Sequence, residues 1–267
     1  MSRLAQTLHE TRTRGQAALV PFLTAGDPDL GVTRQLVCAA VEGGADVIEL
    51  GVPFSDPMAD GPVLQRAAAR AIAAGTTVAR VLELVGEVRR ELTVPIVLFG
   101  YFNPFFRYGV DAVARDGAAA GVDGILCVDL PFEEATELRA ATRDNGLDLI
   151  ALLAPTTPPE RARRIAASAS GFLYFVSVLG VTGARTELPP ELPRLVAAVR
   201  EVTDLPIGVG FGVQRPEQAA WVAGFADAVI VGSAIATLLE GTPREERAGR
   251  LRDFLGSLRD AMRAAGR

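Results

Sequence analysis

Short apolar runs alternate along the chain with longer segments in which apolar residues recur three and four positions apart. The short runs are typical of strands buried on both faces of a parallel sheet, and the longer segments of helices with one buried stripe. We expect strands within residues 18–25, 46–52, 95–101, 124–130, 148–154, 171–178, 206–212 and 227–233. We expect helices within residues 30–43, 62–74, 77–91, 109–120, 133–145, 158–168, 191–202 and 215–223.

This repeating order of strand and helix predicts a (β/α)8 TIM barrel, because eight such units in about 250 residues are the usual size of that fold. Residues 1–14 predict an extra N-terminal helix that would close the barrel floor, and residues 243–265 predict the last helix. An open doubly wound sheet with an extra domain is the alternative, although no glycine-rich dinucleotide motif opens the first helix. No low-complexity linker divides the chain, so we expect residues 1–267 to form a single domain.

Composition narrows the possible partners. The net charge is −5 and the arginines are spread along the chain, so we expect no nucleic-acid partner. No apolar run is long enough to span a bilayer and the N-terminal segment lacks the apolar core of a signal peptide, so we expect a cytoplasmic protein without membrane association. Cys38 and Cys127 have no nearby Cys or His partner, and we expect both to be buried, reduced thiols.

Two scarce residue types restrict the chemistry. All 27 basic residues are arginines, and the one histidine is His9, which we expect on the surface of a helix. A Schiff base with a carbonyl substrate or with pyridoxal phosphate needs a lysine amine, so both chemistries are excluded. A single histidine also argues against a histidine-ligated metal centre and a Ser-His-Asp relay. If the protein is an enzyme, carboxylates, hydroxyls and backbone groups must carry out its chemistry.

A carboxylate stands where the second strand enters the barrel mouth. Side chains alternate along a strand, so Glu49 lies on the face opposite Ile48 and Leu50. The two aliphatic side chains should face the helices, which leaves Glu49 pointing inward at the end of the barrel that binds substrates. Burial raises the pKa of a carboxyl group toward the range useful for proton transfer, so Glu49 is interpreted as a catalytic acid–base. Asp60, on the following loop, fits either a catalytic or a helix-capping role.

Glycine-rich loops predict a phosphate site at the same end. The stretch 180–186 follows the sixth strand, and such a loop can close over a substrate. The seventh strand ends in 208–212 and the eighth in 231–235, where glycine N–H groups and a short helix starting at Ser233 would bind an anion. Aromatic residues near the strand ends could wall an apolar pocket, namely Phe22, Phe99, Tyr101, Tyr174 and Phe211.

Several segments resemble the family of tryptophan synthase alpha subunits in their order and spacing. They are ELGVPFSDPMADGPVLQ (49–65), FGYFNP (99–104), VDLPFEE (128–134), GVTGAR (180–185), and GFGV with GSAI (210–213 and 232–235). The resemblance covers nearly the whole chain. It implies a (β/α)8 barrel that cleaves indole-3-glycerol phosphate to indole and glyceraldehyde 3-phosphate by a retro-aldol reaction, without metal or organic cofactor.

The same resemblance implies roles for individual residues. Glu49 would protonate indole C3 and also serve the deprotonation of the side-chain hydroxyl, and Asp60 would stabilise positive charge at the indole nitrogen and take its proton. Thr182 would lie beside Asp60 when its loop closes. The remaining implied substrate-binding residues are Phe22, Tyr101, Leu126, Tyr174 and Phe211 around the indole, and Gly183, Gly212, Gly232 and Ser233 around the phosphate.

The resemblance also implies a partner, a β subunit that holds pyridoxal phosphate and receives indole through a tunnel to make L-tryptophan in an α2β2 heterotetramer. The implied docking residues are Pro53, Asp56, Pro57, Asn103, Pro104, Phe105, Asp129 and Pro131. Two alternatives remain open. Another phosphosugar enzyme on this barrel would not need the long segment 49–62, and a non-catalytic activator of a β subunit would not need to retain Glu49 and Asp60.

Overall fold

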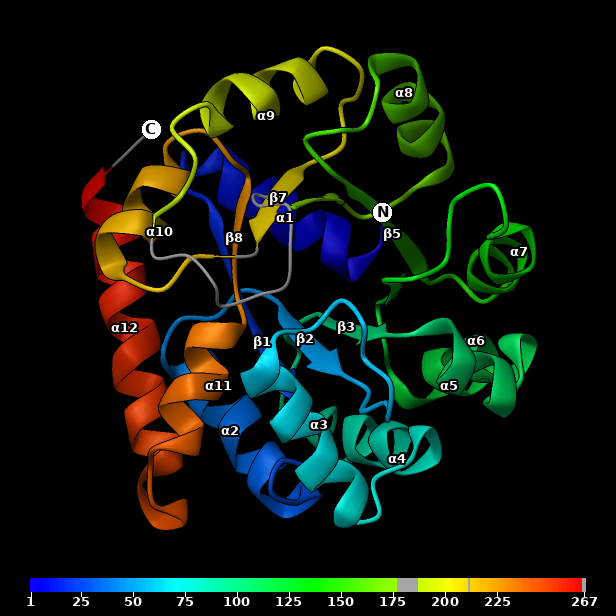
Figure 1. Cartoon of the computed structure of the whole chain (residues 1–267), viewed down its shortest axis with the longest axis vertical. Helices are drawn as coiled ribbons and strands as arrows, with labels where there is room; N and C mark the ends of the chain where they lie inside the picture. The colour runs from blue at the N-terminus through cyan, green and yellow to red at the C-terminus, as the bar shows by residue number, and fades with distance from the viewer. Residues whose placement is uncertain (177–186, 211, 266–267) are drawn as a thin grey trace.

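The computed structural model describes residues 1–176, 187–210 and 212–265, and its parallel strands close into a barrel (Figure 1). The strands are β1 (Ala18–Thr24), β2 (Ile48–Gly51), β3 (Ile96–Gly100), β4 (Gly124–Cys127), β5 (Asp148–Leu153), β6 (Leu173–Val176), β7 (Ile207–Gly210) and β8 (Ala228–Val231). Each pairs with its neighbours in sequence, and β1 also pairs with β8. The predicted barrel is confirmed. The observed strands are shorter than the apolar runs because apolar residues continue past the last ladder pairs into the loops.

Helices surround the barrel (Figure 1). They are α1 (Arg3–Thr13), α2 (Leu30–Glu42), α3 (Pro62–Ala73), α4 (Val78–Val88), α5 (Phe102–Tyr108), α6 (Val110–Ala120), α7 (Thr136–Asp144), α8 (Pro159–Ser168), α9 (Leu192–Arg200), α10 (Pro216–Ala223), α11 (Ser233–Glu240) and α12 (Arg247–Ala265), with a 3₁₀ turn η1 (Arg244–Glu246) before α12. The sequence prediction missed α5, because this segment of seven residues is rich in aromatic residues and holds Pro104. Its first N–H, from Phe102, donates to Asp129 Oδ1 at 2.7 Å, a contact between residues 27 positions apart.

The strands separate two apolar layers. Ile48 and Leu50 of β2 pack outward with the helices, whereas Val47 belongs to the cluster inside the barrel. Leu4 and Leu8 of α1 are buried in that same inner cluster, so α1 closes the barrel floor as predicted. The alternation expected for β2 is therefore confirmed.

Aspartates just before or at strand starts hold the lower end of the barrel together. Each carboxylate accepts a hydrogen bond from a backbone N–H of the preceding strand, in the pairs Asp46 with Leu19 (2.8 Å), Asp123 with Ile96 (2.8 Å) and Asp227 with Ile207 (2.9 Å). An arginine also binds each aspartate, and these are Arg259, Arg89 and Arg200, respectively. Arg259 of α12 donates further to the carbonyl oxygens of Ala17 (3.2 Å) and Gly44 (2.6 Å). Polar groups at this end are thus engaged in holding the fold.

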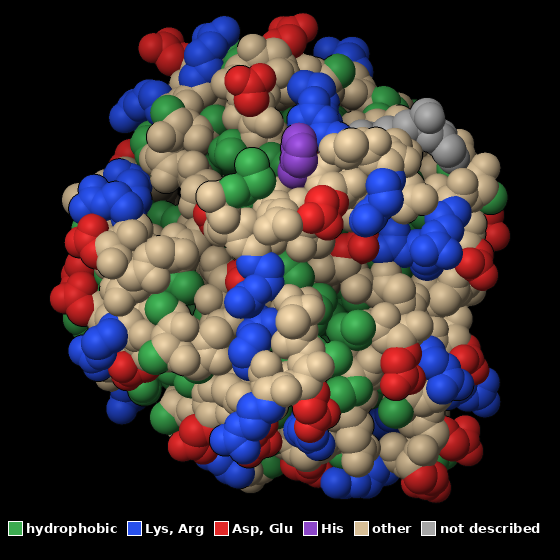
Figure 2. All heavy atoms as spheres, turned by 180° about the vertical axis from the view of Figure 1, so that it is seen from behind, with side chains coloured by type: hydrophobic (Ala, Val, Ile, Leu, Met, Phe, Trp, Pro, Cys, Tyr) green, Lys and Arg blue, Asp and Glu red, His purple; other side chains and the backbone are tan. Residues whose placement is uncertain are grey.

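Figure 2 shows the face opposite to that of Figure 1, with acidic and arginine side chains interspersed. His9 of α1 is exposed there, as predicted for a surface helix residue. Because the charges of opposite sign lie close to one another, they largely neutralise each other's field on this face.

Candidate active site

Glu49 lies inside the barrel on β2 and is 0 % exposed. Its neighbours in register are Phe22 on β1 and Val97 on β3. Neither carboxyl oxygen has a hydrogen-bond partner among the residues that the structure describes. Burial raises the pKa of Glu49 to about 8, because no partner compensates the charged form for lost water. At neutral pH the group is therefore mostly protonated and able to donate a proton.

Asp60 lies on the loop between β2 and α3 and is half-buried. Burial raises its pKa to about 6, while a hydrogen bond with Tyr101 acts in the opposite direction. The phenol oxygen of Tyr101 also accepts a hydrogen bond from the N–H of Ala59 at 3.1 Å, which fixes the loop against the end of β3. Asp60 is mostly ionised at neutral pH. The two carboxyl groups thus differ in protonation state.

One cavity brings both carboxyl groups together with five of the ten predicted substrate-binding residues. It is lined by Phe22, Glu49, Asp60, Leu64, Phe99, Tyr174, Gly212, Ile230, Gly232 and Ser233. Tyr101 lines an adjoining cavity, also with Phe22 and Asp60. Leu126 lines neither cavity, although it is buried inside the barrel. Thr182, Gly183 and Phe211 lie outside the described residues.

Leu64 and Ile230 line the cavity but were not predicted, whereas Phe99 was predicted only as a possible wall of an apolar pocket. The sequence carries a signal for both Phe99 and Ile230. Phe99 stands two residues after Val97 on β3, so it shares the inward face, and the same alternation applies on β8. Leu64 belongs to the first turn of α3. Its position depends on how the preceding loop turns, which the sequence pattern does not specify.

Aromatic rings lean across the barrel mouth where glycines leave room for them. A Cβ on Gly51 would come within 2.4 Å of Phe22 Cζ, and a Cβ on Gly210 within 2.1 Å of the Tyr174 hydroxyl. The Phe22 ring meets Phe99 edge-on with centroids 5.2 Å apart. This packing leaves a cavity of only about 30 Å³.

One side of the cavity is formed by glycines and by the start of a helix. Helix α11 begins at Ser233, so its free N–H groups and positive dipole end lie beside the cavity that Glu49 lines. Gly212 has φ +119°, a conformation that other residues rarely adopt. No arginine lines this cavity among the described residues. A phosphate bound here would rely on backbone donors.

Comparison with known proteins places this geometry in a family. The family model described as tryptophan synthase alpha chain matches residues 8–263. The chain belongs to the tryptophan synthase alpha chain family. The tryptophan synthase alpha chain of Geobacter sulfurreducens is 50 % identical over 262 residues, covering 98 % of this chain and 99 % of the relative. That of Synechocystis is 52 % identical over 247 residues, covering 92 % and 94 %.

Solved structures agree with this membership. Tryptophan synthase subunit alpha from Legionella pneumophila superposes with a TM-score of 0.91 at 39 % identity, covering 99 % of each chain. A chain of tryptophan synthase from Mycobacterium tuberculosis gives a TM-score of 0.90 at 42 % identity, covering 98 % of each chain. As a tryptophan synthase alpha chain family member, the protein is a lyase of tryptophan biosynthesis.

Three segments of the alpha chain carry the predicted docking residues, and direct contacts join them. The Phe54 ring packs on Tyr101 with centroids 5.4 Å apart, which joins the loop after β2 to the start of α5. Asp129, in the loop after β4, accepts the N–H of Phe102 at the same point. The predicted residues with exposed or partly exposed side chains are Pro53, Asp56, Pro57, Asn103, Pro104, Asp129 and Pro131. The three segments therefore form one continuous surface.

The predicted docking residue Phe105 is buried, so it is removed from the docking surface. Its ring is 0 % exposed and lies under β3, where a Cβ on Gly100 would come within 2.7 Å of Phe105 Cζ. Its side chain cannot contact a partner, because it belongs to the apolar layer beneath α5. Phe106 is 62 % exposed and Met58 78 % exposed, and neither was predicted. Recognising α5 as a helix would have placed Phe102 and Phe106 together on one face, away from Phe105.

Other sequence predictions concern metal ions, membranes and thiols. Within the described ranges, no group of three or more His, Cys, Asp and Glu side chains is placed to hold a metal ion. None of the described helices has both the length and the apolar character needed to cross a bilayer. Both cysteines are free, but only Cys127 is buried. The buried residues of α2 form a stripe that faces the barrel, and Cys38 lies at the edge of this stripe, so it is only half-buried.

Proposed function

We propose that this alpha chain cleaves indole-3-glycerol phosphate to indole and glyceraldehyde 3-phosphate by a retro-aldol reaction. The observation that carries the proposal is the pair of carboxyl groups in one cavity, with pKa values raised to about 8 for Glu49 and about 6 for Asp60. At neutral pH this pair supplies one proton donor and one anion. Two carboxyl groups whose environments give them different pKa values can take separate acid and base roles.

In the proposed mechanism, Glu49 donates its proton to indole C3. Positive charge then develops at the ring nitrogen, where the Asp60 carboxylate stabilises it and accepts the N–H proton in a hydrogen bond. Glu49, now ionised, accepts the proton of the hydroxyl on the adjoining side-chain carbon. The bond between that carbon and C3 breaks, its electrons restore the indole ring, and the hydroxyl becomes the aldehyde of glyceraldehyde 3-phosphate. Each proton that leaves Glu49 is thus replaced within the reaction.

The remaining predicted residues complete the proposed substrate site. Gly183, Gly212, Gly232 and Ser233 bind the phosphate through backbone donors, and Phe22, Tyr101, Leu126, Tyr174 and Phe211 surround the indole. Thr182 binds Asp60 when its loop closes. Leu64, Phe99 and Ile230 are added to the apolar wall because they line the same cavity.

We further propose that the surface formed by the three docking segments binds a β subunit in an α2β2 heterotetramer and that indole passes to that subunit. Support comes from the contacts that join these segments and from the exposed apolar side chains of Phe106 and Met58 beside them. Pyridoxal phosphate belongs to the β subunit in this proposal. The alpha chain, which has no lysine, works without metal or organic cofactor in the cytoplasm.

The direct test is the initial rate of indole release from indole-3-glycerol phosphate, with and without an equimolar cognate β subunit. We expect slow release by the alpha chain alone and a rate at least about tenfold higher with the partner. The isosteric variant Glu49→Gln should lose a factor of about 10² or more, because it cannot exchange a proton. Absence of indole from folded wild-type protein under both conditions would contradict the proposal. If that protein still activated the β subunit, it would be a non-catalytic activator.

A further inference from the structure

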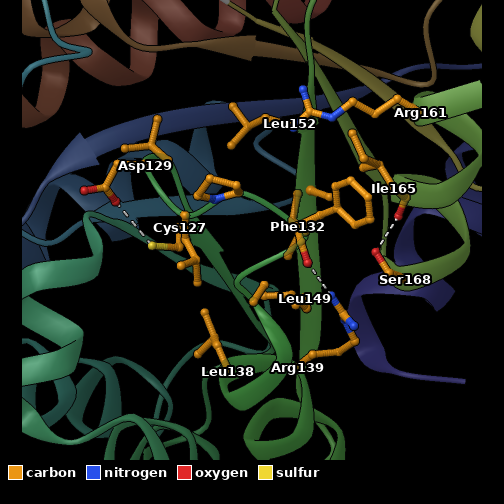
Figure 3. Close-up of a pocket in the computed structure, with 16 residues that line it drawn as sticks. Cys127, Asp129, Phe132, Leu138, Arg139, Leu149, Leu152, Arg161, Ile165 and Ser168 are labelled. Carbon is orange, nitrogen blue, oxygen red and sulfur yellow. Dashed lines mark hydrogen bonds between the residues drawn. The ribbon is translucent and has the colours of Figure 1, made fainter. Parts of the chain in front are cut away.

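A second cavity lies on the other side of the sheet, between strands β4 and β5 and helices α7 and α8 (Figure 3). It measures about 260 Å³ and shares no lining residue with the cavity that Glu49 lines. Most of its wall is apolar and comes from the outward faces of the two strands and from the two helices. The main apolar contributors are Cys127, Leu138, Leu149, Ala151 and Ile165.

Arg139 of α7 lies at one edge of this cavity. Its Nη2 donates to the carbonyl oxygen of Phe132 at 2.6 Å, as Figure 3 shows. Its Nε is buried and finds no acceptor in residues 1–176, 187–210 or 212–265. A buried N–H of a charged group without an acceptor is costly, and native structures normally supply a partner. Arg139 lines the cavity, so an acceptor bound there meets its guanidinium group.

The charges around the cavity favour an anion. Arg139 and Arg161 both line it, against one carboxylate, Asp129, which is already bound to the N–H of Phe102. Arg161 pairs with Glu133 at 3.3 Å and lies 5.7 Å from the centroid of the Phe132 ring. Because Glu133 offsets Arg161, Arg139 is the stronger anchor for an anionic group.

The shape and size of the cavity limit the rest of the ligand. The cavity of about 260 Å³ has room for a small organic molecule. Figure 3 shows Phe132 close to Ile165, and Leu149 belongs to the same outer apolar layer, so a flat ring can contact both aromatic and aliphatic surface. A single ring that carries one carboxylate matches this lining.

We propose that the cavity between β4, β5, α7 and α8 binds a small aromatic carboxylate. The carboxylate accepts from the guanidinium group of Arg139, and the ring lies against Leu149, Ala151 and Ile165. The site is separate from the proposed reaction centre but shares Asp129 and Pro131 with the proposed docking surface, so its test uses the alpha chain without a β subunit. A cavity filled only with water is the alternative occupant.

The probe is benzoate, titrated calorimetrically into the full-length chain. We expect a dissociation constant of about 1 mM or tighter, which is modest because the probe is small. Benzyl alcohol, which keeps the ring but lacks the charge, should bind at least about tenfold more weakly. Undetectable benzoate binding at about 10 mM would overturn the proposal and leave water as the occupant.

Variants locate the binding. Arg139→Met keeps much of the apolar stem of the side chain but removes its donors, and Ala151→Leu reduces the volume of the cavity while leaving the arginine in place. Each should weaken benzoate binding by about tenfold or more, and the second keeps the test valid if the first variant fails to fold. Glu49→Gln is the control and should bind benzoate like the wild type. Benzoate binding that survives both cavity variants, or that is lost in Glu49→Gln, would contradict the assignment.

Discussion

At the scale of the residue, the environment of Glu49 departs most from what a carboxyl group ordinarily meets. Water and hydrogen-bond donors normally stabilise the ionised form, yet Glu49 is 0 % exposed and its oxygens have no partner among the described residues. The group therefore holds its proton until about pH 8. Asp60 releases its proton near pH 6, because it is less buried and is bound by Tyr101.

This difference predicts a bell-shaped pH dependence of kcat/KM for indole release. Activity should fall below about pH 6, as Asp60 becomes protonated, and above about pH 8, as Glu49 loses its proton. The measurement is the initial rate at low substrate concentration between pH 5 and pH 10. Asp60→Asn should lower the rate and remove the acidic limb. A profile with no loss of activity above pH 8 would contradict the role of Glu49 as the proton donor.

The same burial predicts an effect on stability. The pKa of Glu49 rises from 4.5 to about 8 on folding, so the folded state binds more protons between these values. The free energy of unfolding should therefore fall as pH rises from about 4.5 through about 8, by on the order of 5 kcal/mol at most from this group. Denaturant unfolding at pH 5, 7 and 9 measures the change. Glu49→Gln should be less sensitive to pH in this window, and equal slopes for both proteins would count against the burial.

At the scale of the residue, the sequence pattern predicts the direction of some side chains and not of others. The inward direction of Glu49 follows from strand alternation alone, because β2 is regular and its other face is aliphatic. Asp60 could not be assigned by spacing, since its direction depends on contacts of its loop with Tyr101. Phe105 was misplaced for a related reason. The residue at which α5 begins determines whether Phe105 or Phe106 points outward. That start is stabilised by Asp129, which is distant in the sequence.

At the scale of the element, an ion network joins the helices on either side of the reaction centre. Arg70 of α3 binds Asp27 through Nε and Nη2 at 2.7 and 2.8 Å, and its Nη1 binds Glu240 of α11 at 2.8 Å. Arg66 of α3 also binds Glu240, at 2.7 Å. Helix α3 follows the Asp60 loop, and α11 begins at the proposed phosphate site. The network therefore sets the distance between these two parts of the site.

We expect Arg70→Met to destabilise the protein by about 1–3 kcal/mol, because it leaves Asp27, which is 6 % exposed, without its bidentate partner. It should also raise KM for indole-3-glycerol phosphate, because α11 then keeps only the Arg66–Glu240 link to α3. Denaturant unfolding and steady-state kinetics measure the two effects. Arg66→Met is the matched control, since its partner Glu240 is exposed to solvent, and should cost less than about 1 kcal/mol. Equal effects of the two variants would refute this account.

Most elements could be predicted from the sequence because each strand and each long helix carries its own periodic pattern. The predicted ranges contained all the observed strands and all the longer helices. Helix α5 lacked such a pattern, and a carboxylate in the loop after the next strand satisfies its first N–H. A prediction from the local sequence alone cannot include that contact.

At the scale of the whole molecule, the two ends of the barrel have different tasks. Aspartates and arginines hold strands at the lower end, whereas Glu49, Asp60 and the proposed docking segments lie at the upper end. Substitutions at the lower end should change stability, and those at the upper end should change activity or association.

Burial modifies this division at the upper end, as the neighbours Phe105 and Phe106 of α5 show. We expect Phe106→Ala to leave unfolding unchanged within about 0.5 kcal/mol and to weaken binding to the β subunit, because the exposed ring is lost from the proposed docking surface. Phe105→Ala should cost about 3–5 kcal/mol of stability, because it empties a buried site. Denaturant unfolding and a binding titration with the β subunit measure both. Unchanged affinity of Phe106→Ala would remove α5 from the interface.

The contacts of Arg259 have a consequence for the order in which the protein can be completed during synthesis. This side chain binds the carbonyl oxygens of Ala17 and Gly44, which leave the ribosome more than two hundred residues earlier. β1 likewise lacks one of its two neighbouring strands until β8, with which it closes the barrel, has been synthesised. A nascent chain therefore carries open sheet edges until translation is almost finished, and these edges are sites where unfinished chains can associate. Chaperone binding is expected to be most useful in that interval.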